Sequence, residues 1–397
     1  MFLIKNCRFV SELTEGTELT QGDILLDGNR IKAILPAGSQ VQGVTEELDA
    51  NGMTILPGLI DAHVHLTGTT KMQTLHCFHS SCRRSFDALE FAQFLLDHGY
   101  TTVRDCGDNL DYATIALRDA ICRGVVKGPN VIPCGLTLCV DNFSAEWKDR
   151  VELVSGPGEF RKAARNELSH GAEFIKLYGS GSIIAGTAEP GAATMMDDEI
   201  QAAVEIATFR GTYCAIHSHG RHAIDQAVRL GVRTIEHATF IGEETLRRMD
   251  GRKDCGIIPT LAVICGHISP KQKAEMGSAR VAKMEKIVQE MCKCLRNAYE
   301  NHDVLIGWGT DVHLPDYRHD PYAEFRMRHD KLGCSNIELL KQATINSAKL
   351  ICKDDQIGSI KEGKLADLIL VQGNPESDIQ VMYEKPIHVI KSGSLIR

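Results

Sequence analysis

The sequence predicts an α/β protein, a (β/α)8 (TIM) barrel joined to a small β-sandwich that both chain ends form. Three observations indicate this fold class. Eight short, apolar, β-branched runs occur between residues 56 and 311, amphipathic segments separate them, and both chain ends carry alternating strand-like runs instead. Strands that alternate with helices form parallel sheets, and eight such units over roughly 300 residues fit a closed barrel better than an open sheet.

The eight apolar runs are the expected barrel strands. They span residues 56–66, 101–105, 130–135, 173–179, 213–219, 232–238, 256–263 and 303–311. Helix signals support the units between them. The expected helix Phe160–His170 stops at Gly171, and Asp198–Arg210 opens with acidic residues and stops at Gly211. A longer helix is expected at 273–299, where apolar residues recur every three or four positions.

The two chain ends, residues 2–34 and 358–396, combine strand-like runs with turn signals such as Asp27-Gly28-Asn29. Each end alone is too short to build a core. We therefore expect a composite sandwich domain of residues 1–55 and 357–397 beside a barrel domain of residues 56–356.

The composition excludes several classes of protein. The 397 residues are 43% hydrophobic and 24% charged, with 44 Lys and Arg against 52 Asp and Glu, so the net charge is −8. This composition excludes a disordered chain, a collagen and a small disulfide scaffold. A mildly acidic chain without basic runs favours neither nucleic acid nor an anionic membrane as a partner. The expected partner is a small molecule.

The sequence contains no run of about 18 apolar residues that could span a bilayer. Lys5 and Arg8 interrupt the first ten residues, which do not resemble a signal peptide. The fourteen cysteines include no C-x-x-C motif, which favours free thiols in a reducing compartment. We expect a cytoplasmic protein that forms a symmetric homo-oligomer, with a subunit number that the sequence does not define.

His63-Val64-His65 follows the first apolar run. Residues i and i+2 of a strand face the same side, so both imidazoles can reach one metal ion. Two surface histidines at this spacing also arise by chance. The position of this pair at the carboxyl end of a barrel strand, where barrel enzymes have their active sites, favours a functional role.

Lys176 lies in the middle of the apolar run Phe174–Tyr178. Taken alone, it is best interpreted as a lysine near a strand end whose amine reaches solvent. A buried lysine must instead be paired, neutral or chemically altered. The sharper hypothesis is a neutral Lys176 that has captured carbon dioxide as a carbamate, whose two oxygen atoms would bridge a pair of metal ions.

Three further expected strands end in residues that can bind metal. These residues are His217 and His219, His237, and Asp311. Each also has a simpler interpretation, as a surface histidine or as the N-cap of the next helix. If every simple interpretation were correct, five strands of one barrel would each carry such a residue by chance, so the joint pattern favours a metal site. Imidazole, carboxylate and carbamate groups suit zinc or a similar divalent ion.

These segments resemble the amidohydrolase superfamily, and the match covers nearly the whole chain. The matching motifs are LPGLIDAHVHL at 56–66, FIKLYGSG at 174–181, AIHSHG at 215–220, TIEHA at 234–238, IGWGTD at 306–311 and IGSIKEGKLADLILV at 357–371. Within the superfamily, the lysine and HSHG segments are most similar to the branch of imidazolonepropionase-like and Xaa-Pro dipeptidase (prolidase-type) enzymes.

The resemblance implies a set of ligands for two divalent ions, expected to be Zn²⁺. The more buried ion would take His63, His65 and Asp311, the more exposed ion His217 and His237, and N6-carboxylated Lys176 would bridge them. It also implies that a metal-bridging hydroxide attacks a polarised carbonyl while Asp311 passes the proton to the leaving nitrogen. Metal-bound water loses a proton near neutral pH, which is consistent with this mechanism.

The substrate is less well indicated than the metal site. Four residues near strand ends are expected to contact a substrate carbonyl or carboxylate, namely Tyr178, His219, Arg221 and His313. Members of the branch carry a Gly-Gly-His stretch after the third strand, whereas this chain has Cys139–Ser144 there. This difference weakens the assignment of dipeptidase activity in particular.

Three functional hypotheses follow. The first is a binuclear hydrolase that cleaves an amide C–N bond, in a dipeptide such as Xaa-Pro, an N-acyl amino acid or a related small amide. The second is a mononuclear deaminase or an imidazolonepropionase-type cyclic amide hydrolase, which would not need Lys176. A non-catalytic barrel is disfavoured because the ligand set is complete.

Overall fold

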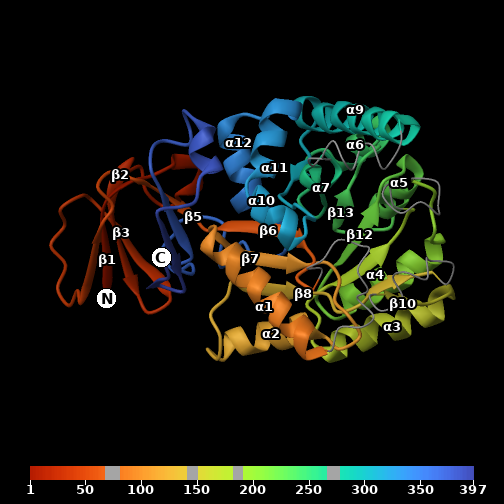
Figure 1. Cartoon of the computed structure of the whole chain (residues 1–397), viewed down its shortest axis with the longest axis horizontal. Coiled ribbons are helices and arrows are strands. Elements are labelled where there is room, and N and C mark those ends of the chain that lie inside the picture. Colours follow the sequence, from red (N-terminus) through yellow and green to blue (C-terminus); the bar gives the residue numbers. More distant parts are fainter. Residues whose placement is uncertain (68–80, 141–150, 182–190, 266–277) are drawn as a thin grey trace.

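The computed structural model describes residues 1–67, 81–140, 151–181, 191–265 and 278–397. Its larger part is a ring of parallel strands inside a layer of helices, and a mainly antiparallel sheet built from both chain ends lies beside it (Figure 1). The apolar residues form one large core cluster around the parallel strands, a second cluster within the end sheet, and a third that includes Ile60, Ile132 and Ala215 of the parallel strands. The sheet and the ring thus each have a core.

The parallel strands form two sheets, with the orders β6-β7-β8 and β10-β9-β11-β12-β13-β14-β15. Their bounds are β6 (Leu59–Val64), β7 (Tyr100–Asp105), β8 (Asn130–Pro133), β9 (Thr137–Cys139), β10 (Val151–Leu153), β11 (Ile175–Tyr178), β12 (Cys214–Ser218), β13 (Thr234–His237), β14 (Gly256–Ile258) and β15 (Leu305–Ile306). Backbone hydrogen bonds join the sheets on both sides. Ala62 donates to Trp308 across 2.9 Å, and Glu173 donates to Pro133 across 2.8 Å.

Several strands are shorter than the sequence predicts. The expected strand 56–66 is two strands, because residues Thr54–Pro57 form β5 in the end sheet and β6 begins only after Gly58. A Cβ atom at Gly58 would lie 2.0 Å from the Thr101 hydroxyl, so glycine allows this change of direction. The expected strand 256–263 stops before Pro259, which lacks an N–H to donate to a neighbouring strand.

The helices cover the outside of the parallel strands (Figure 1). They are α1 (Ser81–Asp97), α2 (Ala113–Cys122), α3 (Gly156–His170), α4 (Asp197–Phe209), α5 (Arg221–Arg229), α6 (Glu243–Met249), α7 (Leu261–Cys265), α9 (Ser278–Asn301), α10 (Leu314–His319), α11 (Ala323–Met327), α12 (Asn336–Lys341) and α13 (Ser347–Leu350). The predicted helices agree with α3, α4 and α9, although residues 273–277 of the third prediction lie outside the described residues. In the described part of the chain, no helix has the length and apolar composition needed to cross a membrane.

The end sheet joins strands from both termini in the order β18-β17-β16-β5-β1-β2-β3, with β4 beside β1. Its strands are β1 (Phe2–Arg8), β2 (Gln21–Asp27), β3 (Arg30–Leu35), β4 (Glu46–Asp49), β5 (Thr54–Pro57), β16 (Leu368–Val371), β17 (His388–Lys391) and β18 (Ser394–Leu395). Gly28 connects β2 to β3 with a φ of 59°, as the turn signal predicts. The pairing of both ends is therefore observed, while the two-layer sandwich and the domain bounds stay predictions.

Candidate metal centre

The predicted ligands lie at the carboxyl ends of the parallel strands. His63 and His65 lie at the end of β6, Lys176 on β11, His217 on β12 and His237 on β13, and Asp311 follows β15. Parallel strands of a barrel present their carboxyl ends at one face, so side chains that are far apart in sequence meet there. Apart from Lys176, the structure brings these residues together in two groups, which share His237 as a neighbour.

The first group contains His63, His65 and Asp311. The Oδ1 atom of Asp311 lies 3.7 Å from Nε2 of His63 and 3.4 Å from Nε2 of His65. The Asp311 amide donates to the His63 carbonyl across 2.8 Å, which fixes the chain after β15 beside the end of β6. The Nδ1 atom of His65 lies 3.4 Å from the Gly107 carbonyl. The Nε2 atoms of both imidazoles are thus on the side of the carboxylate.

The second group contains His217, His219 and His237. One ring nitrogen from each lies within 4.8 Å of the others, close enough to hold one ion. Nε2 of His237 is 2.8 Å from Nδ1 of His217. The other nitrogen of His237 contacts the Thr260 hydroxyl at 2.7 Å, and Nδ1 of His219 contacts the Thr239 hydroxyl at the same distance. His219 was expected to contact substrate, but its position is equally suited to a metal ligand.

The backbone is strained where these side chains leave their strands. His237, Ala238 and Asp311 have φ values of 70°, 47° and 54°, in the left-handed region that residues other than glycine seldom adopt. Such conformations cost on the order of 1–3 kcal/mol each and cluster at functional sites. The turn at His237 also explains how it and the preceding residue, Glu236, both lie against His63.

Lys176 is 3% exposed, and its Nζ atom has no hydrogen-bond partner among the described residues. On β11 it pairs in register with Ala215 of β12, two residues before His217. Burying an amine without a hydrogen-bond partner costs free energy, so this lysine needs an explanation. A carbamate on Nζ would have oxygen atoms to offer to metal ions, so the orphaned amine is consistent with the predicted bridge.

Burial keeps four imidazoles of the site neutral, those of His63, His217, His219 and His237. It lowers the pKa of His63 to about 4 and that of His219 to about 3. Burial and the neighbouring histidines hold the pKa values of His217 and His237 well below the usual range. Neutral imidazoles retain a lone pair that can bind a cation. The donor set therefore fits divalent metal ions.

Three buried residues that the sequence reasoning missed support the site. Asp61 accepts hydrogen bonds from the His63 and Thr310 amides and from the Tyr317 hydroxyl, and burial raises its pKa to about 6. Glu236 contacts His63, and Arg104 contacts Glu236, both at 2.7 Å.

Sequence signals existed for two of these residues, Asp61 and Arg104. Asp61 shares the strand face of His63 and His65, and Arg104 interrupts an apolar run, where a charge needs a partner. Burial opposes ionisation of Glu236, but the charge of Arg104 and the His63 hydrogen bond lower the pKa of Glu236 below the usual range.

The predicted substrate contacts differ in how close they lie to the histidines. The ring of Tyr178 stacks on His217 with centroids 4.0 Å apart. His313 is at the N-cap position of α10, two residues after Asp311, and its side chain makes no capping hydrogen bond. In contrast, the side chain of Arg221 lies against Gly242, the residue before α6. Among the described residues, we observe no contact between Arg221 and His217, His219 or His237.

Two loops near these strand ends are partly described. Residues 141–144 of the Cys139–Ser144 stretch lie outside the described residues. In the small-residue segment after β11, the Ser180 hydroxyl accepts a hydrogen bond from the His219 amide at 2.9 Å. This segment therefore helps to hold the end of β12.

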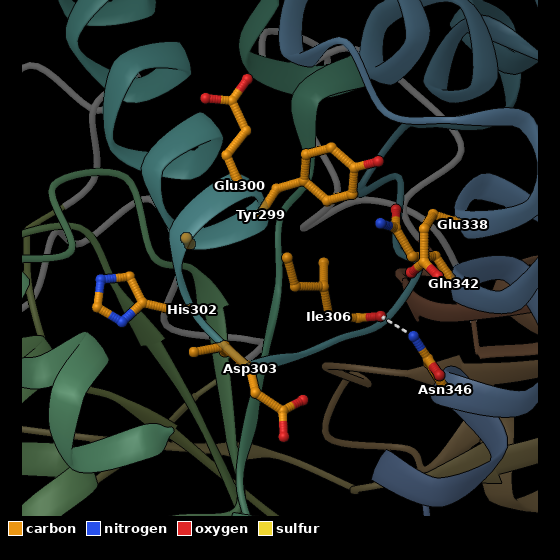
Figure 2. A pocket seen from close by; sticks show the side chains of 10 residues that line it. Tyr299, Glu300, His302, Asp303, Ile306, Glu338, Gln342 and Asn346 are labelled. Atoms are coloured by element: carbon orange, nitrogen blue, oxygen red, sulfur yellow. Dashed lines mark hydrogen bonds between the residues drawn. The ribbon is translucent and has the colours of Figure 1, made fainter. Parts of the chain in front are cut away.

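A cavity of about 410 Å³ opens elsewhere, at the amino end of β15 (Figure 2). His302 and Asp303, which precede β15, line it together with Glu338 and Asn346, and the Asn346 amide donates to the Ile306 carbonyl across 3.1 Å. None of the predicted ligands lies among its lining residues. It is therefore separate from the metal-binding candidates.

Known proteins share both the sequence pattern and the fold. The model of the Amidohydrolase family matches residues 54–396. Ochratoxinase of Aspergillus niger is 27% identical over 382 residues, which cover 86% of this chain and 75% of that protein. A probable imidazolonepropionase of Nematostella vectensis is 24% identical, with 88% of this chain and 82% of that protein covered.

Two solved structures are similar over the full chain. A prolidase complexed with N-methylphosphonate-L-proline superposes with a TM-score of 0.86 at 27% identity, covering 100% of this chain and 99% of that chain. A Xaa-Pro dipeptidase with bound methionine gives a TM-score of 0.85 at 27% identity with the same coverage. These neighbours confirm the prediction of a TIM barrel with an additional domain.

Proposed function

Because the chain belongs to the amidohydrolase family and is an enzyme that acts on carbon–nitrogen bonds, we propose a more specific function. The proposed function is that of a binuclear metal-dependent hydrolase of small amides. The observation that carries the proposal is the buried Nζ atom of Lys176, which has no described partner and lies among neutral histidines. A mononuclear site would leave this amine without a role.

The residues divide into two sets of ligands. His63, His65 and Asp311 would hold the first ion, His217 and His237 the second, and N6-carboxylated Lys176 would bridge both. His219 is the alternative ligand of the second ion, because its ring nitrogen lies within reach of the same point. When bound, divalent ions such as Zn²⁺ supply Lewis acidity and lower the pKa of a coordinated water.

Asp311 is the proposed catalytic acid–base residue. Its carboxylate lies beside the Nε2 atoms of His63 and His65, and its own backbone is fixed by hydrogen bonding to the His63 carbonyl. A carboxylate held at this point can take the proton of an attacking water and then deliver it to the leaving nitrogen. Tyr178, stacked on His217, is the best placed of the four proposed substrate contacts.

The proposed substrates are amides in which the leaving amine is an amino acid, namely Xaa-Pro dipeptides and N-acyl amino acids. The support is the likeness to a prolidase that binds a proline-containing phosphonate and to a Xaa-Pro dipeptidase that binds methionine. Incubation with a library of Xaa-Pro, Xaa-Arg and N-acyl amino acids, followed by quantification of released amino acid, tests this substrate class. Wild-type protein should cleave at least one member, and Asp311→Asn should cleave none at a comparable rate.

The likeness to a probable imidazolonepropionase favours a second candidate, a mononuclear hydrolase of cyclic amides or a deaminase. It would use the histidines and Asp311 without the lysine. No cleavage in the library, together with one metal ion per chain, would support this second candidate instead.

A further inference from the structure

Glu236 lies between Arg104 and His63 in the interior of the parallel strands, and none of the three is more than 2% exposed. Its Oε2 atom is 2.7 Å from Nδ1 of His63. Its Oε1 atom accepts hydrogen bonds from Arg104 at 2.7 Å and from the Thr234 hydroxyl at 2.6 Å. Both carboxylate oxygens are therefore engaged, and one ring nitrogen of His63 faces the carboxylate.

Arg104 fixes the orientation of this carboxylate. Its Nε atom donates to the Ala62 carbonyl at 2.7 Å, and Nη1 donates to Thr234 at 2.9 Å. Its guanidinium carbon lies 5.1 Å from the centre of the Phe174 ring. A guanidinium is a rigid planar fork, so these contacts leave one direction for the bond to Glu236. The network joins β6, β7 and β13 directly behind His63.

His63, Cys106 and Glu236 also have ligand atoms within 4.8 Å of one another, which raises the question of a third metal site. A cation at that point would compete with the Arg104 guanidinium for the same carboxylate. Two positive charges in contact within the barrel interior would repel strongly. The carboxylate thus serves the arginine and the histidine rather than a metal ion of its own.

We propose that Glu236, held by Arg104, is a positioning residue that fixes the Nδ1-protonated tautomer of His63 and so presents the Nε2 lone pair to the metal site. A carboxylate only accepts hydrogen bonds, so the shared proton belongs to Nδ1. Nε2, which lies 3.7 Å from Asp311 Oδ1, is then the nitrogen left to bind a cation. The consequence for metal binding rests on the proposed function, whereas the tautomer is a property of the chain alone.

The first test is the tautomer of His63 in metal-free wild-type protein, read by ¹⁵N NMR with histidine labelling. His63→Asn identifies the signal by its loss. The proposal requires a neutral ring with the proton on Nδ1. A neutral ring with its proton on Nε2 would overturn the proposal. The measurement uses wild-type protein, so it does not depend on whether a Glu236 variant folds.

The second test is Glu236→Gln, since an amide can donate to Nδ1 and so move the ring proton to Nε2. The zinc affinity, measured by competition with a chelating dye, should fall about 10- to 100-fold, as loss of such supporting contacts typically causes. Asp367→Asn is the matched control. Asp367 is another buried acid, paired with Lys391 at 3.1 Å in the end sheet, and its loss should leave zinc affinity unchanged.

The outcomes separate the inference from the proposed function. Unchanged zinc affinity and an unchanged His63 tautomer in Glu236→Gln would overturn the inference while leaving the metal centre intact. A wild-type protein that binds no zinc would overturn the proposed function. In that case the NMR measurement still decides whether Glu236 sets the tautomer.

Discussion

The Nε2 atom of His237 lies 2.8 Å from the Nδ1 atom of His217, although twenty residues separate them in sequence. The two histidines are on neighbouring strands, β12 and β13, which pair in parallel register up to Ser218 and His237. Burial and the neighbouring histidines hold the pKa values of both rings well below the usual range, so the two neutral rings can lie in contact. The pair belongs to the group His217, His219 and His237, whose ring nitrogens lie within 4.8 Å of one another.

Replacement of Lys176 tests the bridge. In Lys176→Ala, we expect the metal content to fall from about two ions per chain toward one, because the variant cannot form the carbamate. Elemental analysis after zinc reconstitution measures this change. Lys364→Ala is the control, since Lys364 is also buried but bonds to Ser359 at 2.6 Å, away from the histidines. Two ions retained in Lys176→Ala would refute a bridging role.

Asp311 should be needed for turnover. Asn at position 311 preserves the shape of the side chain but cannot carry a proton between water and the leaving nitrogen. We expect kcat to fall about 10²- to 10⁴-fold, measured on any amide that the wild-type protein cleaves. The control is Asp303→Asn. Asp303 is an exposed acid that pairs with Lys253 and precedes the amino end of β15, so its replacement should leave kcat within a few-fold of wild type. Equal loss in both variants would argue against a specific role.

Gly220 should tolerate no side chain. It lies directly after the HSHG histidines, and a Cβ atom there would be 1.8 Å from the Gly191 carbonyl. Gly220→Ala should therefore push the two segments apart, at a cost of about 1–3 kcal/mol in the free energy of unfolding. Activity should fall as well, because the segment carries His219. Chemical denaturation and amide hydrolysis measure both effects.

The matched control for this steric prediction is Gly158→Ala in α3, where a Cβ atom would have no neighbour within 4 Å. This variant should be as stable as wild type or more so, because alanine favours a helix over glycine. If Gly220→Ala behaved in the same way, the close approach of the two segments would not be required.

His302 should make stability depend on pH. Burial opposes its protonation, but hydrogen bonds to Asp250 and Glu243 prevail and raise its pKa above 6.5. A raised histidine pKa stabilises the folded state below the unfolded pKa, and this contribution is lost as pH rises through the folded pKa. His302→Gln should thus lower the free energy of unfolding at about pH 6 by roughly 1 kcal/mol or less, and hardly at about pH 9. An equal effect at both pH values would contradict the charged interaction.

The sequence was sufficient to predict eight of the ten parallel strands, though not β9 and β10, and most of the side chains that meet at their carboxyl ends. Both follow from local patterns, because apolar runs mark strands and a parallel barrel brings strand ends to one face. Strand lengths were less predictable. Whether the chain remains in a strand depends on local breaks such as Gly58 and Pro259, and the run 56–66 divides between two sheets.

Contacts between side chains from distant strands were not predictable. Arg104 and Glu236 are 132 residues apart, and only the folded barrel shows that each neutralises the other. Arg221 is an example of a predicted contact that does not form. Its position after the fifth predicted strand placed it near the site, but the sequence did not determine where its side chain points. At the start of α5 its side chain turns toward Gly242 rather than the histidines.

The most direct test of the account is the metal content of wild-type protein expressed with zinc and bicarbonate and measured by elemental analysis. The account predicts about two ions per chain, because the proposed ligands form two groups and the buried Nζ atom of Lys176 has no partner among the described residues. One ion per chain, unaffected by Lys176→Ala, would contradict the binuclear centre and favour a mononuclear hydrolase or deaminase.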